Sequence, residues 1–156
     1  MNNNLAIYLN DHLAGSVAAI ELIDDLISAL DEEPLKIFLA DLRRDIESDQ
    51  TVLKQLIARA DENESVARKT AAWVSEKAAR MKIKFAGEDF GELGLAQALE
   101  MLALGIHGKE SLWRTLATLN WPALQDVDLA KLEQRAVEQE KRVETKRLEA
   151  AKAAFS

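Results

Sequence analysis

The chain of 156 residues contains no cysteine. This absence excludes disulfide bonds, thiolate nucleophiles and metal sites built on thiolate ligands. It is compatible with a reducing compartment, and we expect a cytoplasmic protein. A chain of this length buries about 70% of its unfolded surface in one domain, so the fold needs no disulfide or structural metal. We therefore expect a single domain over residues 1–156.

Long hydrophobic runs are also absent. No stretch approaches the roughly 20 apolar residues that a membrane-spanning helix requires. The first ten residues lack the basic start and the apolar run of a signal peptide. The net charge of -7 opposes binding to nucleic acid and to anionic membranes. We therefore expect neither a membrane span nor a nucleic-acid partner.

Glycine and proline are scarce, with six and two residues respectively. The rest of the chain is dominated by strong helix formers, namely Ala, Leu, Glu, Lys, Arg and Gln, so we expect an all-α fold. Apolar residues recur at spacings of three and four, as in helices that bury one face. This pattern predicts long helices at residues 3–30, 34–60, 90–119 and 127–155, and a shorter helix at residues 64–85.

The lengths of the links predict how these helices connect. The first and last links are too short for anything but antiparallel hairpins, whereas residues 61–89 can run back along a bundle. The second and third long helices should therefore be parallel, which gives an up-down-down-up four-helix bundle with a helical crossover. The crossover is a basic island in an acidic chain and could meet an acidic protein partner, although such charge runs are usually solvated faces. Its basic residues are Arg68, Lys69, Lys77, Arg80, Lys82 and Lys84.

Near the middle of each long helix, a polar or small residue stands where the apolar seam should place a core residue. These four residues are Ser16, Gln50, Gly105 and Gln139. Asp49 lies at the same level on the neighbouring line of the second helix, and Lys109 follows Gly105 by one turn on its seam. The sequence thus predicts a polar layer across the waist of the bundle.

Two stretches of the chain resemble bacterioferritin-type proteins of the ferritin-like superfamily. The residues similar to their first helix are Leu9-Asn10, Leu13-Ala14 and Ala19-Ile20, and those similar to their third helix are Leu102-Ala103-Leu104, Gly108 and Leu112. In that family, a Glu from each of two helices and a Glu-x-x-His from each of the other two hold two iron ions. The resemblance implies the ferritin-like connectivity that the link lengths predict independently.

The same resemblance places this chain's residues at the family's ligand positions. Ser16 and Gly105 stand where the single Glu ligands would be. One Glu-x-x-His motif becomes Glu47-x-x-Gln50, and the other retains no carboxylate at its first position and ends in Gln139. Glutamine is a poor ligand for iron beside a single carboxylate. The resemblance therefore implies a bundle whose metal site has been lost, with no cofactor.

The surviving Glu47 has two interpretations. A buried carboxylate without a partner is costly, so Glu47 would need Lys109, Gln50 or Gln139 as a partner in a buried hydrogen-bond network that keeps the helices in register. Alternatively, Glu47 faces outward and has no special role.

A displaced mononuclear metal site is an alternative use of this chain's histidines. It would consist of His12, Glu47 and His107, which come from three different helices. The chain has no His-x-x-x-His or Glu-x-x-His spacing, and a lone helical histidine is usually a surface residue or a satisfied core residue.

Glycines in the middle of a helix also have two interpretations, because each lowers helix stability by about 1 kcal/mol relative to alanine and so needs a reason. Gly15, Gly105 and Gly108 would serve either close helix packing or a cavity for a small apolar ligand. No nucleophile with a neighbouring base and no phosphate-binding loop can be assembled. We therefore expect a non-enzymatic structural or interaction module, a homodimer, with a metal-binding or iron-handling protein and a carrier of a small apolar ligand as alternatives.

Overall fold

The computed structural model describes residues 3–60, 76 and 91–156. Apart from Glu76, the predicted crossover helix and its basic surface lie outside these residues. The described part contains four long α-helices, a short 3-10 helix and no strand, which confirms the all-α prediction. The elements are α1 (Asn3–Ala29), α2 (Glu33–Ala60), α4 (Glu92–Ala117), η1 (Pro122–Leu124) and α5 (Leu129–Phe155). Within the described ranges, no helix is both long enough and apolar enough to span a bilayer.

Local sequence signals explain where these helices begin. Glu33 lies in the first turn of α2, where its charge faces the positive end of the helix dipole, and Pro34 follows where its missing N–H is not needed. Before α5, Pro122 opens η1, and the side chain of Asp128 accepts a hydrogen bond of 3.0 Å from the backbone N–H of Lys131. This capping bond fixes the start of the last helix.

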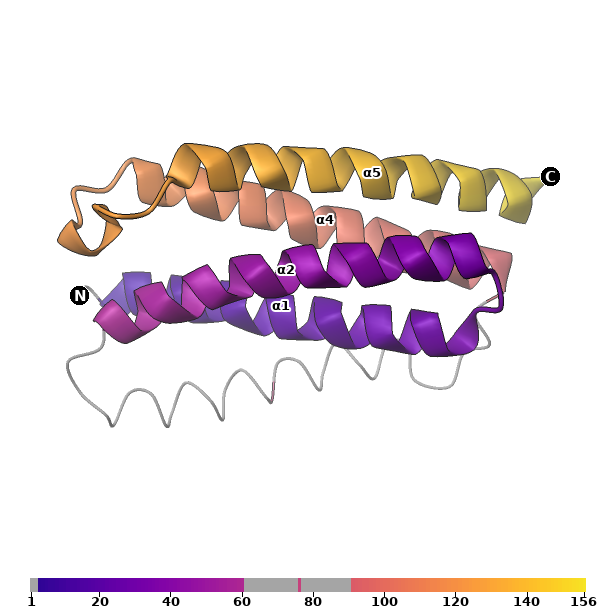
Figure 1. Cartoon of the computed structure of the whole chain (residues 1–156), viewed down its shortest axis with the longest axis horizontal. Helices are drawn as coiled ribbons and strands as arrows, with labels where there is room; N and C mark the ends of the chain where they lie inside the picture. The colour runs from indigo at the N-terminus through magenta and orange to yellow at the C-terminus, as the bar shows by residue number, and fades with distance from the viewer. Residues whose placement is uncertain (1–2, 61–75, 77–90) are drawn as a thin grey trace.

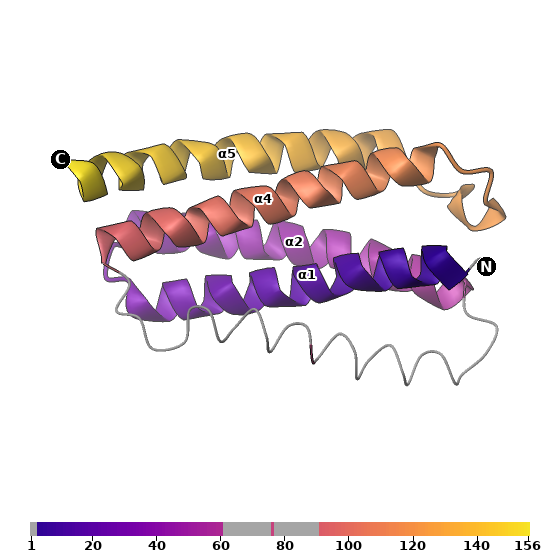
Figure 2. The same cartoon turned by 180° about the vertical axis from the view of Figure 1, so that it is seen from behind.

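Two helical hairpins form the body of the structure. Figure 1 shows α1 beside α2 and α5 beside α4, and Figure 2 shows the same pairs from behind. Helix α1 also packs against α4, which joins the two hairpins. Helix α2 ends at one end of the bundle and α4 begins at the other (Figure 1), so these two helices run in the same direction while α1 and α5 run in the opposite one.

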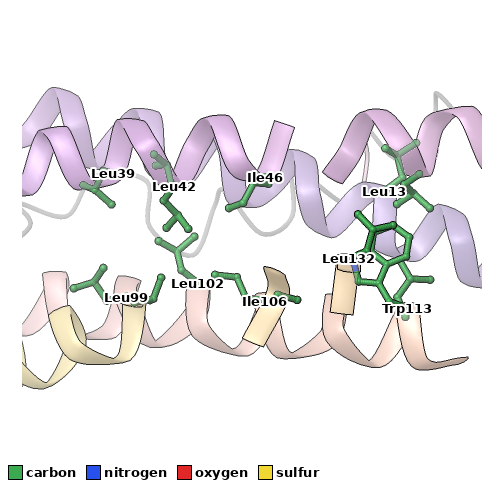
Figure 3. Close-up of a cluster of buried hydrophobic side chains, with 14 of the residues drawn as sticks. Leu13, Leu39, Leu42, Ile46, Leu99, Leu102, Ile106, Trp113 and Leu132 are labelled. Atoms are coloured by element: carbon green, nitrogen blue, oxygen red, sulfur yellow. The ribbon is translucent and has the colours of Figure 1, made fainter. Parts of the chain in front are cut away.

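The core follows apolar lines on the facing sides of the helices. On α2, one line of buried positions repeats at spacings of four and three, and Gln50 is buried beside it. The line consists of Leu35, Leu39, Leu42, Ile46, Asp49, Leu53 and Leu56. Figure 3 shows one apolar group around Ile46 and Ile106 and a second around Leu13 and Trp113. Asp49 follows Ile46 by three residues, so the one polar member of the α2 line lies where a layer between these two groups is expected.

Candidate functional site

A buried carboxylate, Asp49, is the centre of the polar layer. Its side chain is 1% exposed, and its Oδ2 accepts hydrogen bonds from Lys109 Nζ at 2.7 Å and from Gln139 Nε2 at 3.1 Å. Lys109 also donates to Gln139 Oε1. Arg135 Nη2 lies 3.2 Å from Asp49 Oδ1, an ion-pair distance at which no hydrogen bond is aligned. The charge of Asp49 is thus balanced by cations from α4 and α5.

A second part of the layer lies between α1 and α2. Gln50 Nε2 donates to Ser16 Oγ at 2.9 Å, and Ser16 Oγ donates to the backbone carbonyl of Leu13 at 2.7 Å. Lys54 Nζ donates to Gln50 Oε1 at 2.7 Å. These bonds hold the amide of Gln50 and the hydroxyl of Ser16 within the first hairpin.

Glu47 lies outside the layer. Its carboxylate is 2.6 Å from Arg43 Nη1 on the same helix, and its side chain is 45% exposed. The outward-facing alternative is therefore where the structure places Glu47, and the carboxylate that Lys109 binds is Asp49. Residues two positions apart on a helix differ by about 200° of rotation, so the carboxylates of Glu47 and Asp49 face nearly opposite sides of α2. The spacing of apolar residues on α2 indicated that Asp49 is buried, whereas the alignment with Glu-x-x-His pointed to Glu47.

Gly105 also departs from the expected layer. It is exposed, and its neighbour Ile106 is the buried residue at this level of α4. The core line of α4 therefore runs through Ile106 and on to Lys109, whose long stem reaches the buried Asp49.

The layer does not fit a di-iron centre. Among the residues that the structure describes, Asp49 is the only carboxylate in the layer, and both Lys109 and Arg135 bring positive charge to it. Two divalent ions require several negative ligands in such a buried place. Burial lowers the pKa of Lys109 from its usual value, and the Asp49 carboxylate opposes this shift. The ammonium of Lys109 thus neutralises the buried carboxylate, as a metal ion would in a metal-binding bundle.

Beside this layer lies a cavity of about 210 Å³ between α1, α2 and α4. Apolar side chains form most of its wall, and Gly15, Gly105 and Gly108 line it as well. A Cβ atom added at Gly15 or Gly105 would meet nothing within 4 Å. Because Gly105 is exposed, the cavity opens to the exterior there. The glycines of α1 and α4 therefore leave space at the waist. The apolar wall residues are Ala19, Ile46, Leu53, Leu102, Ile106, Leu112 and Trp113.

His12 lies in the wall of this cavity. Its ring contacts Tyr8 edge to face, with ring centroids 4.6 Å apart. Burial lowers the pKa of His12 below its usual value of 6.5, and the charge of Asp11 opposes the shift. The imidazole is therefore neutral at pH 7.

His107 lies elsewhere, on the outside of the α4–α5 hairpin. Its Nδ1 is 3.4 Å from Glu140 Oε2 and 3.6 Å from Glu110 Oε2. The structure therefore does not bring His12, Glu47 and His107 together. Instead it groups His107 with two glutamates that the sequence analysis did not single out, one a helical turn away on α4 and one across on α5.

We expect Asp49 to be far more important for stability than Glu47. Asp49→Ala should lower the free energy of unfolding by about 3–5 kcal/mol, because it leaves a buried ammonium without its carboxylate. Glu47→Ala, which removes only an exposed pair, should change it by no more than about 1 kcal/mol. Urea unfolding followed by circular dichroism measures both.

The double variant Asp49→Leu/Lys109→Met serves as the control for this pair, because it removes both charges together and should recover part of the loss. Equal losses in Asp49→Ala and Glu47→Ala would contradict the assignment of Asp49 as the buried partner of Lys109.

The His12 environment predicts a pH dependence. The pKa is lower in the folded state, so between that value and about 6.5 the unfolded chain binds more protons. The free energy of unfolding should therefore rise with pH through this window and level off above it. In His12→Gln this contribution is absent, so urea titrations from pH 5 to 8 should show a smaller decline on acidification than in the parent chain. Parallel curves for the two proteins would contradict this prediction.

Comparison with models of known protein families, with curated proteins and with solved structures gives no match for this chain. The geometry of the layer and of its cavity is therefore the basis for assigning a function.

Proposed function

We propose that this chain is a non-enzymatic, ferritin-like bundle that binds a small, largely apolar molecule in the cavity beside Asp49 and Lys109. The observation that carries this proposal is the cavity of about 210 Å³, with its apolar wall and its opening at Gly105. A concave, mostly apolar pocket with a few polar groups is typical of small-molecule sites.

The ferritin-like part of the proposal has two supports. The helix directions agree with an up-down-down-up bundle, since α2 and α4 run in the same direction. In that family the metal ligands project into the bundle core from facing helices, and the buried polar residues of this layer also come from facing helices. In this chain, the layer would keep the helices in register by hydrogen bonds and charge pairing instead of by metal coordination.

The hydrogen bonds of Ser16 and Lys109 support a binding role for the pocket over a catalytic one. A nucleophile requires a base within hydrogen-bond reach. Ser16 Oγ instead donates to a backbone carbonyl and accepts from the Gln50 amide, neither of which is a base at neutral pH. Lys109 is bound to Asp49 and Gln139. These groups form a satisfied scaffold around the pocket.

Homodimer formation and a cytoplasmic location stay predictions. Several large apolar side chains are exposed on the described helices and would suit contact with a second copy. They are Ile7, Ile37, Leu93, Leu104, Leu148 and Phe155.

Filling the opening of the pocket tests the binding role. We expect indane, a bicyclic hydrocarbon, to bind the parent chain at a single saturable site and to raise its thermal midpoint. Gly105→Leu should weaken that binding at least tenfold, because the new side chain occupies the empty space at the opening. Isothermal titration calorimetry and thermal unfolding measure these effects.

Gly91→Ala is the matched control for Gly105→Leu. Gly91 also has open space where its side chain would be, but it lies at the start of α4 and does not line the cavity. This variant should bind indane like the parent chain. No saturable binding to the parent chain, or equal binding to Gly105→Leu, would reject the proposed pocket.

A second candidate function, binding of a divalent cation, is favoured by the group of His107, Glu110 and Glu140. One ligand atom from each residue lies within 4.8 Å of the other two. Ligands about 2.0–2.1 Å from a tetrahedral zinc ion are about 3.4 Å apart, close to the 3.4 and 3.6 Å that separate His107 Nδ1 from the two carboxylates. Arg114 pairs with Glu110 at 2.5 Å and would compete with the cation.

Cobalt and zinc titrations test this second candidate. We expect the visible absorption of Co²⁺ to report nitrogen and oxygen ligands in the parent chain, with Zn²⁺ displacing it. His107→Ala and Glu140→Gln should each weaken binding at least tenfold, whereas His12→Gln should leave it unchanged. Binding that survives the loss of both His107 and Glu140 would reject the site.

A further inference from the structure

One polar side chain of the pocket wall, His12, takes no part in the polar layer. It is partly buried and lines the cavity, and within the described part of the chain neither ring nitrogen makes a hydrogen bond. Neither nitrogen is enclosed as Trp113 Nε1 is. The imidazole is neutral at pH 7, so one of its nitrogens accepts a hydrogen bond and the other donates one. The pocket therefore holds a strong acceptor that a bound molecule can use.

Contacts with two helices hold this imidazole in place. The ring of Tyr8 packs against it edge to face, with ring centroids 4.6 Å apart, and Tyr8 Oη donates to Thr115 Oγ1 of α4 at 3.3 Å. The imidazole also lies close to α4 at Gly108, where an added Cβ atom would be 4.0 Å from His12 Cε1. The ring is thus oriented before a ligand enters, which lowers the cost of binding.

The other polar groups of the layer are engaged or out of reach. Ser16, Gln50 and Lys109 form hydrogen bonds within the layer. The unpaired atoms Trp113 Nε1 and Asp49 Oδ1 have almost no accessible surface, so a molecule in the cavity cannot contact them. Polar recognition therefore falls to the two remaining polar residues of the wall, which are neighbours on α1.

The second of these residues, Asp11, limits the charge of the ligand. It lines the cavity beside His12, and its carboxylate accepts hydrogen bonds but cannot donate them. Its negative charge disfavours an anion or a carbonyl oxygen nearby. A cation would lose water on entering a mostly apolar wall, and the charges of Asp49 and Lys109 already neutralise each other. An uncharged ligand that donates a hydrogen bond suits both residues of α1.

The volume of the cavity limits the size of the ligand. An apolar cavity of about 150 Å³ holds benzene. The 210 Å³ of this cavity therefore corresponds to about eight to ten non-hydrogen atoms.

We infer that the pocket takes an uncharged molecule of this size whose hydroxyl group donates a hydrogen bond to the imidazole of His12 while its apolar body fills the cavity. This inference rests on the proposed function, because it requires that the cavity binds a small molecule. It adds the chemical class of that molecule and the residue that selects it.

Indane and 5-indanol test the inference, because they share a bicyclic skeleton and differ in one hydroxyl group. The two dissociation constants are measured at pH 7 for the parent chain and for His12→Phe, which keeps an aromatic ring beside Tyr8 but has no ring nitrogen. The ratio of the indane constant to the 5-indanol constant should be about tenfold larger in the parent chain than in the variant. Comparing ratios removes effects of the variant that are common to both probes.

Nuclear magnetic resonance of the parent chain gives a readout that does not depend on the variant's stability. The ring nitrogen signals of His12 should shift when 5-indanol is added and should shift much less with indane. His107 does not line the cavity, so its signals are the internal control, and His107→Ala assigns them.

A cationic probe tests the alternative that the charge of Asp11 selects the ligand. 2-Aminoindane has the same skeleton and carries a positive charge at pH 7, and it should bind the parent chain more weakly than 5-indanol does. Tighter binding of this cation, weakened in Asp11→Asn, would overturn the inference of an uncharged ligand.

The remaining outcomes separate this inference from the proposed function. Saturable binding of indane and 5-indanol, with equal ratios in the two proteins and no specific shift at His12, would overturn the role of His12 and leave the binding pocket in place. A parent chain that binds none of the probes would overturn both.

Discussion

The buried pair of Asp49 and Lys109 is the interaction on which the rest of the arrangement depends. It joins α2 of the first hairpin to α4 of the second, and Gln139 extends it to α5. A shift of any of these helices by one turn would leave a buried charge without its partner, which is far more costly than the loss of an apolar contact. The pair therefore specifies register at a level where purely apolar helices would be free to slide.

This layer also explains how a pocket can persist next to charged groups. Ser16 and Gln50 bind each other on one side, and Asp49, Lys109 and Gln139 bind one another on the other. Because these groups satisfy one another, they do not need water from the cavity between α1, α2 and α4. The remaining wall is mostly apolar, and the glycines leave it open.

Much of the fold followed from the sequence, because the spacing of apolar residues and the scarcity of glycine and proline act locally along each helix. The ends of the four long helices lie within two residues of the predicted ones. The site was harder to predict. Aligning Glu47-x-x-Gln50 with a metal motif favoured Glu47, whereas burial on α2 follows the line through Ile46 and Leu53 that includes Asp49. The grouping of His107 with Glu140 depends on how α4 and α5 pack, which spacing within one helix does not specify.

On α4, three residues at intervals of four bring the parts of the site together. Such residues lie on one face, one turn apart. Gly105 is exposed at the opening, the side chain of Lys109 is 14% exposed and binds the layer, and Trp113 is 1% exposed with an unused donor. The exposed fraction on this face thus falls from Gly105, through the neutralised charge of Lys109, to the buried ring of Trp113. A molecule that enters at Gly105 would exchange water for an apolar wall, and it would do so without separating Asp49 from Lys109, because that pair is already bound on its own.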